Sequence, residues 1–223
     1  MEKGKPIRVW DLPTRLFHWL LAVLFTVSFL TAAMGGNAMP YHEKSGYAIL
    51  TLLVFRMVWG FVGGRESRFT SFVRGPKAVA GYAASLMDRS STPHLGHNPL
   101  GGWSVIAMLT TLFIQAGTGL FANDDIFTQG PLYYLVNDET SHLLTNIHKF
   151  NQEILILLVA VHICAIFFYL FYKRENLIIP MITGFKQWAG NAVEPDANHA
   201  WPAVVIAALS AVAVYLLVHS GAP

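Results

Sequence analysis

Long apolar stretches separated by polar loops run through most of the chain. A helix needs about 20 residues to cross about 30 Å of hydrocarbon. Windows of that length identify five apolar segments, at roughly 15–34, 43–63, 101–121, 147–172 and 202–219. The pattern therefore predicts an all-α, multi-pass integral membrane helical bundle.

Two polar segments interrupt the spans. The loop between the second and third spans is rich in Gly and Pro, and it contains an amphipathic pattern over about 76–88 that begins at Pro76. Proline is favoured in the first turn of a helix. A second polar segment follows the fourth span. Both segments are expected to lie at the membrane surface.

Composition supports a membrane protein and excludes several classes. Of the 223 residues, 54% are hydrophobic and only 13% are charged, values typical of chains that live in lipid. The single cysteine, Cys164, excludes an internal disulfide, and the absence of a CxxCH motif excludes covalently attached haem. With a net charge of +2, nothing in the chain suggests nucleic-acid binding.

The distribution of Lys and Arg predicts the orientation in the membrane. Basic loops are retained on the cytoplasmic side. The loops of one side carry Lys3, Lys5, Arg8, Arg15, Arg65, Arg68, Arg74, Lys77, Arg89, Lys173, Arg174 and Lys186. The other side has Lys44, Lys149 and a group of acidic residues between 124 and 139. We expect the N-terminus to lie on the cytoplasmic side of the membrane and the C-terminus on the opposite side.

Four histidines can be placed by depth. His148 and His162 are fourteen residues apart in the fourth span, which is close to four helical turns, or about 21 Å along one face. The antiparallel order of the spans puts His42, near the start of the second, level with His148. His18, in the first turn of the first span, is then level with His162. The sequence predicts two pairs, one near each membrane surface.

Pairs of buried imidazoles suggest a metal-containing cofactor. A polar side chain inside a membrane protein usually faces the bundle interior and has a partner. Each histidine alone could simply hydrogen-bond a neighbouring helix, but two pairs at matched depths are poorly explained in that way. Two neutral imidazoles on one iron give a saturated haem suited to electron transfer. We therefore expect two haem groups that share the fourth helix.

The chain resembles a known family at these residues. The segments "VWDLPTRLFHWLLA", "HEKSGYAILTLLVFRMVWG", "GHNPLGGWSVIAML" and "HKFNQEILILLVAVH" are similar to the bacterial cytochrome b561 family, which includes the cytochrome b subunits of nickel-iron hydrogenases. The resemblance implies a four-helix core in residues 1–180 that holds two haem b with His18, His42, His148 and His162 as ligands. Residues 181–223 would add an interfacial segment and a fifth helix outside the family pattern.

Three further residues are cofactor-binding candidates. Arg56 follows His42 by fourteen residues, so it should lie at the depth of His162, where it could pair with a haem propionate or line a quinone pocket. The alternative is that it extends to the nearby membrane surface. Gly46 and Gly117 could let a flat macrocycle approach the backbone, although glycine also permits close helix packing without any cofactor.

The histidines of "TPHLGHNPLGG" form a weaker signal. Glycine and proline argue against a helix there, and no carboxylate or cysteine is near enough in sequence to complete a metal site. His94 and His97 are expected either to lie in solvent or to approach a quinone headgroup or a haem edge.

The expected function follows from the resemblance. It is electron exchange between the membrane quinone pool, ubiquinone or menaquinone, and a periplasmic partner such as a cytochrome c or a hydrogenase-like subunit. A stand-alone quinone-linked oxidoreductase acting on a small oxidant such as superoxide is an alternative. A histidine-lined transporter or a membrane anchor is a third, disfavoured because the chain shows no inverted repeat or carboxylate network. A homodimer is left open.

Overall fold

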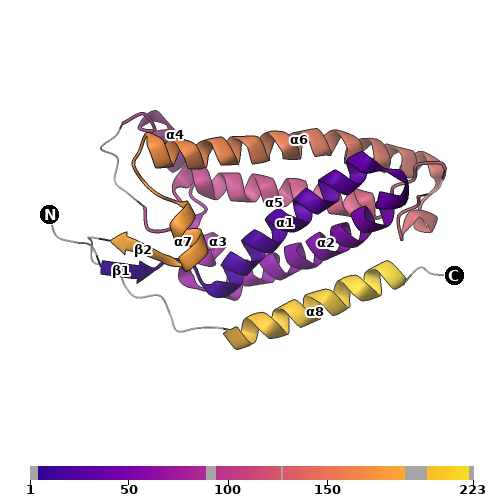
Figure 1. The fold of residues 1–223 in the computed structure, drawn as a ribbon, viewed down its shortest axis with the longest axis horizontal. Helices are drawn as coiled ribbons and strands as arrows, with labels where there is room; N and C mark the ends of the chain where they lie inside the picture. The colour runs from indigo at the N-terminus through magenta and orange to yellow at the C-terminus, as the bar shows by residue number, and fades with distance from the viewer. Residues whose placement is uncertain (1–4, 89–93, 127, 189–199, 221–223) are drawn as a thin grey trace.

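The computed structural model describes residues 5–88, 94–126, 128–188 and 200–220. Within them, five helices are long and apolar enough to cross a membrane. They are α1 (Leu12–Met34), α2 (Met39–Val62), α5 (Pro99–Gly119), α6 (Asp138–Phe171) and α8 (Ala200–His219). Helices α1, α2, α5 and α6 form the bundle, and α8 runs along its flank (Figure 1). The prediction of an all-α membrane bundle is confirmed.

Helices α1, α2, α5 and α6 all begin earlier than the sequence pattern suggested, and α6 differs most. Helix α1 starts at Leu12 because the Asp11 side chain accepts a hydrogen bond from the Thr14 N–H (2.7 Å) and Pro13 occupies the first turn. His18 therefore lies in the second turn of α1, and its placement in the first turn was wrong. Helix α6 begins at Asp138, before the predicted 147, because the Asn137 side chain caps it.

Helix α2 lies at the centre of the packing. It contacts α1, α5 and α8, and its Leu53 and Trp59 are completely buried. The fifth helix joins this core, since Ala203, Ser210 and Val214 of α8 are buried against the bundle. Helix α8 is thus packed mainly along α2, with a smaller contact to α1.

A small sheet closes one end of the bundle. Strand β1 (Lys5–Arg8) pairs antiparallel with β2 (Phe185–Trp188). Gly184, with a φ of +87° that favours glycine, turns the chain from α7 (Ile178–Thr183) into β2. Its carbonyl accepts hydrogen bonds from the N–H groups of Val9 (2.8 Å) and Trp10 (3.2 Å). The sequence pattern did not predict this sheet, which fixes the position of Trp10 at the start of α1.

Short elements cover the same end. They are α3 (Phe69–Phe72), α4 (Pro76–Ala84) and a 3₁₀ turn at Arg65–Ser67, while further 3₁₀ turns at Gly36–Ala38 and Tyr133–Leu135 lie at the opposite end. Helix α4 starts at Pro76 as predicted but ends before Asp88. Of the predicted interfacial segments, residues 89–93 and 189–199 lie outside the described residues.

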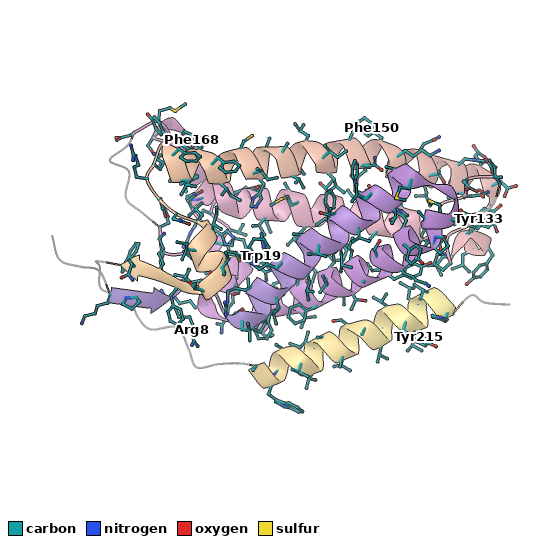
Figure 2. The ribbon with its side chains drawn as sticks, viewed as in Figure 1. Arg8, Trp19, Tyr133, Phe150, Phe168 and Tyr215 are labelled. Atoms are coloured by element: carbon teal, nitrogen blue, oxygen red, sulfur yellow. The ribbon has the colours of Figure 1, made fainter. Side chains whose placement is uncertain are left out.

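The two ends of the bundle differ in charge. The end with β1, β2, α3, α4 and α7, here called the basic end, carries nearly all described Lys and Arg of the loops, whereas Lys3 and Arg89 lie outside the described residues. The other end, called the acidic end, contains the α5–α6 connection with Asp124, Asp125 and Asp138. Arg8 and Tyr133 mark the two ends in Figure 2.

The outward surface between these ends is apolar. Side chains such as Phe150 on α6 and Tyr215 on α8 point away from the bundle and are largely exposed (Figure 2). In water such a surface would be unfavourable, but it matches the acyl chains of a bilayer. Polar chemistry must therefore be sought inside the bundle and at its ends.

Candidate functional site

The four predicted histidines form two pairs. The ring centres of His42 and His148 are 6.1 Å apart at the acidic end, and those of His18 and His162 are 6.3 Å apart at the basic end. An imidazole nitrogen lies about 2 Å from a bound metal such as zinc, so two rings on opposite sides of one metal ion have centres about 6 Å apart. Both pairs have the spacing of two axial ligands.

At the acidic end, hydrogen bonds fix the tautomer of both rings. His42 Nδ1 lies 2.9 Å from the Ser28 carbonyl oxygen, and His148 Nδ1 lies 2.9 Å from that of Gln115. A carbonyl oxygen can only accept, so each Nδ1 carries a proton and donates it. In a neutral imidazole the lone pair is then on Nε2. Metal-binding histidines are commonly oriented by such a bond from the other ring nitrogen.

A polar network continues from His148 across to α5. The Gln115 side-chain amide donates to His148 Nε2 at 3.1 Å, and the Asn151 amide donates to Gln115 Oε1 at 2.7 Å and to the Thr111 carbonyl at 3.0 Å. Asn151 is buried, one turn along α6 from His148. The network holds α5 and α6 in register and gives the Nε2 lone pair a donor partner that a metal could replace.

A cavity of about 350 Å³ lies beside this pair, a volume within the usual range for ligand pockets. It is lined by both histidines, by Gly46 and by Gly119, with Lys149 at its border. A Cβ on Gly46 would meet no atom within 4 Å, whereas one on Gly119 would come within 3.0 Å of the His148 ring. Gly46 thus faces open space, as expected for a position beside a bound group.

Gly117, the other glycine predicted to contact the cofactor, has a different environment. A Cβ there would also meet no atom within 4 Å, but Gly117 is not among the residues that line the cavity. Its neighbour Gly119 is. The contact predicted for Gly117 stays a prediction, and Gly119 was not among the cofactor-binding candidates identified from the sequence.

The basic-end pair is held differently. Among the described residues, His18 Nδ1 has no hydrogen-bond partner although it is buried. The His18 ring instead packs edge-on against Trp19, whose indole N–H donates to the Met181 carbonyl in α7 at 3.2 Å. Trp19 is labelled beside α7 in Figure 2. The orientation of His18 thus depends on aromatic packing rather than on a hydrogen bond to the backbone.

Arg56 lies inside the bundle at the basic end, where it and the histidine pair both lie near His97. Its side chain is 3% exposed, so the alternative that it extends to the membrane surface is wrong. One guanidinium nitrogen donates to the Ser67 carbonyl at 2.9 Å, and the group lies over the Phe69 ring at 4.8 Å. In the part of the chain that the structure describes, Arg56 forms no ion pair within 4.0 Å, and its Nη1 has no partner.

His97 also belongs to this region, and sequence reasoning left its position open. Its ring lies between Trp10 (4.7 Å) and Phe72 (4.6 Å), so the expectation that it lies in solvent is wrong. Burial, together with the nearby Arg56 guanidinium and the histidine pair, lowers the pKa of His97 to about 3. The imidazole is therefore neutral. The HxxH spacing was the only signal, and it did not distinguish His97 from His94.

Asp11 organises the protein around these groups. Besides capping α1, its carboxylate accepts hydrogen bonds from the Trp59 indole N–H (3.2 Å), the Gly64 N–H (3.0 Å) and the Ser67 hydroxyl (2.9 Å). Since Ser67 also provides the carbonyl that Arg56 contacts, Asp11 connects the start of α1 to the loop that follows α2. Its negative charge is already shared among these donors.

These features define a class: an integral membrane helical bundle with two stacked pairs of histidines on α1, α2 and α6. Residues 9–184 match the family described as prokaryotic cytochrome b561, and the chain belongs to that family. It is therefore a membrane b-type cytochrome in electron transfer, and the family implies haem b.

Curated relatives agree with this assignment. A "Probable Ni/Fe-hydrogenase B-type cytochrome subunit" from Bradyrhizobium diazoefficiens is 23% identical over 222 residues, which cover 83% of this chain and 88% of the relative. A protein of the same name from Rhodobacter capsulatus is 20% identical over 230 residues, or 87% of this chain and 86% of the relative. No solved structure matches the chain.

The residues present fit haem better than a bare metal ion. Within the described ranges, no group of three or more His, Cys, Asp or Glu side chains could hold a metal ion. A haem needs only axial ligands from the protein, because the porphyrin supplies the remaining nitrogens. Two imidazoles per site, with Nε2 lone pairs available at the acidic end, match that requirement.

Proposed function

We propose that the protein carries electrons across the membrane between two haem b groups, each held by one histidine pair. The observation that supports this most directly is the placement of the pairs, with ring centres 6.1 and 6.3 Å apart at opposite ends of α6. Haem iron with two axial imidazoles is saturated, so when bound it exchanges single electrons and does not bind oxygen.

Each residue has a defined task in this proposal. His42 and His148 would hold the acidic-end haem through Nε2, because Ser28 and Gln115 keep their Nδ1 protons in place. His18 and His162 would hold the basic-end haem. Gly46 keeps space open beside the acidic-end pair. Helix α6 supplies one ligand to each site and fixes the two sites about 21 Å apart along its axis.

The charge difference between the two ends suggests orientation and partners. Basic loops favour the cytoplasmic side, so we propose that the basic end and the N-terminus are cytoplasmic and that the acidic end and the C-terminus are periplasmic, in a bacterial inner membrane. The acidic end would suit a basic surface of a periplasmic cytochrome c or hydrogenase-like subunit. The names of the relatives support a hydrogenase-type partner.

The membrane-soluble reactant of the proposal is a quinone, ubiquinone or menaquinone. Reduction of a quinone takes up two electrons and two protons, and oxidation of the quinol returns them. Use of this reactant is supported by the membrane location and by the family's role in electron transfer. The stand-alone oxidoreductase that acts on a small oxidant and the possible homodimer have no specific observation in their favour.

The test is a count of haems in single-site variants. Dithionite-reduced minus oxidised spectra and pyridine haemochrome assays should give about two haem b per wild-type chain. His148→Ala and His162→Ala should each retain one, and the retained haems should differ in spectrum and in potential. His142→Ala is the matched control, since His142 is exposed on the same helix and pairs with Asp125 at 3.6 Å; it should retain both haems.

Three outcomes would contradict parts of this proposal. Loss of the same haem in both alanine variants would overturn the two-pair arrangement, and a wild-type protein without haem would overturn the function. If the purified protein holds two haems but neither oxidises a quinol nor reduces a quinone, alone or with a partner, the quinone-linked part fails while the haem sites stand.

A further inference from the structure

Three buried nitrogen atoms without partners converge at the basic end. Within the described residues, they are Arg56 Nη1, His97 Nδ1 and His18 Nδ1; a fourth such atom, Nε of Arg15, belongs to a guanidinium that donates through Nη1 to the Ile182 carbonyl in α7. His97 and Arg56 are close enough to influence each other's charge, as are His97 and the pair His18 and His162. Buried polar groups are nearly always hydrogen-bonded, so a cluster of exceptions needs an explanation. The described residues of the acidic end contain no comparable cluster, since the Nδ1 atoms of His42 and His148 are hydrogen-bonded there.

The chemistry of this cluster requires an acceptor with negative charge. Arg56 can only donate, and its guanidinium is always positive. A buried positive charge without a counter-ion is strongly unfavourable. In the described part of the chain no carboxylate lies within 4.0 Å of Arg56. The closest electrostatic partner, Asp11, already accepts four hydrogen bonds from other groups.

His97 is built to face the same acceptor. Trp10 and Phe72 enclose its ring on two sides, and Trp10 is fixed by the Gly184 carbonyl. Lys186 donates to the His94 carbonyl at 2.5 Å and to Glu175 at 2.5 Å, which anchors the loop that precedes His97. A neutral imidazole can carry its proton on Nδ1 and donate it. Arg56 and His97 would then offer two donors from different elements to one acceptor.

We propose that Arg56 and His97 together bind a propionate carboxylate of the basic-end haem, Arg56 as the counter-ion and His97 as a neutral hydrogen-bond donor. This rests on the proposed function, because it needs a haem on His18 and His162. A carboxylate accepts several hydrogen bonds and forms the shortest ones with a guanidinium. A propionate carboxylate would accept hydrogen bonds from both Arg56 Nη1 and His97 Nδ1.

The test uses redox titration of the basic-end haem alone, in a His148→Ala background that removes the other haem. Reduction adds one negative charge to a haem, so loss of a nearby positive charge must favour the oxidised form. Arg56→Gln should raise the ratio of oxidised to reduced haem at a fixed ambient potential about tenfold, a shift of ~59 mV downward for a one-electron couple.

The His97 variants separate hydrogen bonding from packing. His97→Phe keeps an aromatic ring between Trp10 and Phe72 but removes the donor, and it should raise the same ratio about threefold. His97→Gln keeps a donor and should return the ratio towards wild type. His94→Phe is the control in the same loop, since the His94 ring lies against Tyr82 at 5.3 Å; it should leave the potential unchanged.

Each contrary result has a distinct meaning. An unchanged potential in both Arg56→Gln and His97→Phe would overturn the proposal, and a rise in the KM for a quinol with no change in potential would place a quinone headgroup at the cluster instead. Equal effects of His97→Phe and His97→Gln would reduce His97 to a packing role and also overturn it. If the Arg56→Gln protein does not accumulate, the comparison of His97→Phe with His97→Gln still tests the proposal. A wild-type protein with fewer than two haems is the separate failure of the proposed function.

Discussion

The two histidine pairs have similar ring spacing but different surroundings. At the acidic end, backbone carbonyls of Ser28 and Gln115 fix both Nδ1 atoms, and a cavity of about 350 Å³ lies beside the rings. At the basic end, His18 Nδ1 is buried without a partner among the described residues, and a buried arginine lies beside the pair. At the acidic end, backbone carbonyls orient the imidazole rings. At the basic end, buried hydrogen-bond donors have no acceptor among the described residues.

The difference shows two ways in which a bundle can prepare a cofactor site. Hydrogen bonds donated to backbone carbonyls orient a ligand histidine whether or not the cofactor is present, since main-chain acceptors do not move away. Unpaired donors such as Arg56 cost stability until a ligand satisfies them. We therefore expect cofactor binding to stabilise the basic end more than the acidic end.

The largest effect should come from filling the acidic-end cavity. Gly46→Leu places a branched side chain in the open space beside His42, so a macrocycle can no longer fit there, and the variant should lose about one of its two haems. Because a Cβ at Gly46 meets no atom within 4 Å, the fold without haem should tolerate the change. Pyridine haemochrome assay measures the loss.

Gly117→Leu is the matched comparison. A Cβ at Gly117 also meets open space, but Gly117 does not line the cavity, so both haems should remain. Loss of haem in Gly117→Leu with retention in Gly46→Leu would mean that the macrocycle lies on the other side of α5. That result would restore the contact predicted for Gly117 and remove the one assigned to Gly46.

The helical period explains why the pairs could be predicted from the sequence. Fourteen residues bring His148 and His162 to one face of a helix whatever the details of packing, and apolar spans fix the depth of His18 and His42 to within a turn. The structure brings these four rings together as the depth argument predicted. Their role as ligands stays a prediction.

Contacts between distant loops could not be predicted in the same way. The β1–β2 sheet joins the two segments that flank the family-matched region, residues 9–184. The His97 ring contacts Trp10 and Phe72, which come from two other segments. No local period encodes such contacts. Similarly, only the structure shows that the Asp11 carboxylate accepts hydrogen bonds from α2 and from the loop after it.

The second prediction concerns the stability of the basic end. Asp11→Ala removes the cap of α1 and leaves the Trp59 indole and the Ser67 hydroxyl without that acceptor. We expect a loss of about 3 kcal/mol in the free energy of unfolding. Asn137→Ala, which removes only the cap of α6 at the acidic end, should cost about 1 kcal/mol. Chemical unfolding in detergent micelles compares the two.

Equal losses in these variants would show that the contacts of Asp11 beyond its cap contribute nothing. A larger loss in Asn137→Ala would reverse the comparison between the ends. Asp11→Asn helps to separate charge from geometry, because an amide oxygen can still accept from the Thr14 N–H (2.7 Å) while the negative charge is removed.

The smallest effect should come from Lys149, the cation at the border of the acidic-end cavity. Lys149 is exposed, so solvent and salt screen its charge, whereas Arg56 is 3% exposed. In a His162→Ala background, Lys149→Gln should change the ratio of oxidised to reduced haem by about twofold or less, and added salt should abolish the change. The effect of Arg56→Gln should survive added salt, because buried charges are screened much less. If Lys149→Gln has the larger and more salt-resistant effect, the acidic-end haem depends on a surface cation more than the basic-end haem depends on Arg56.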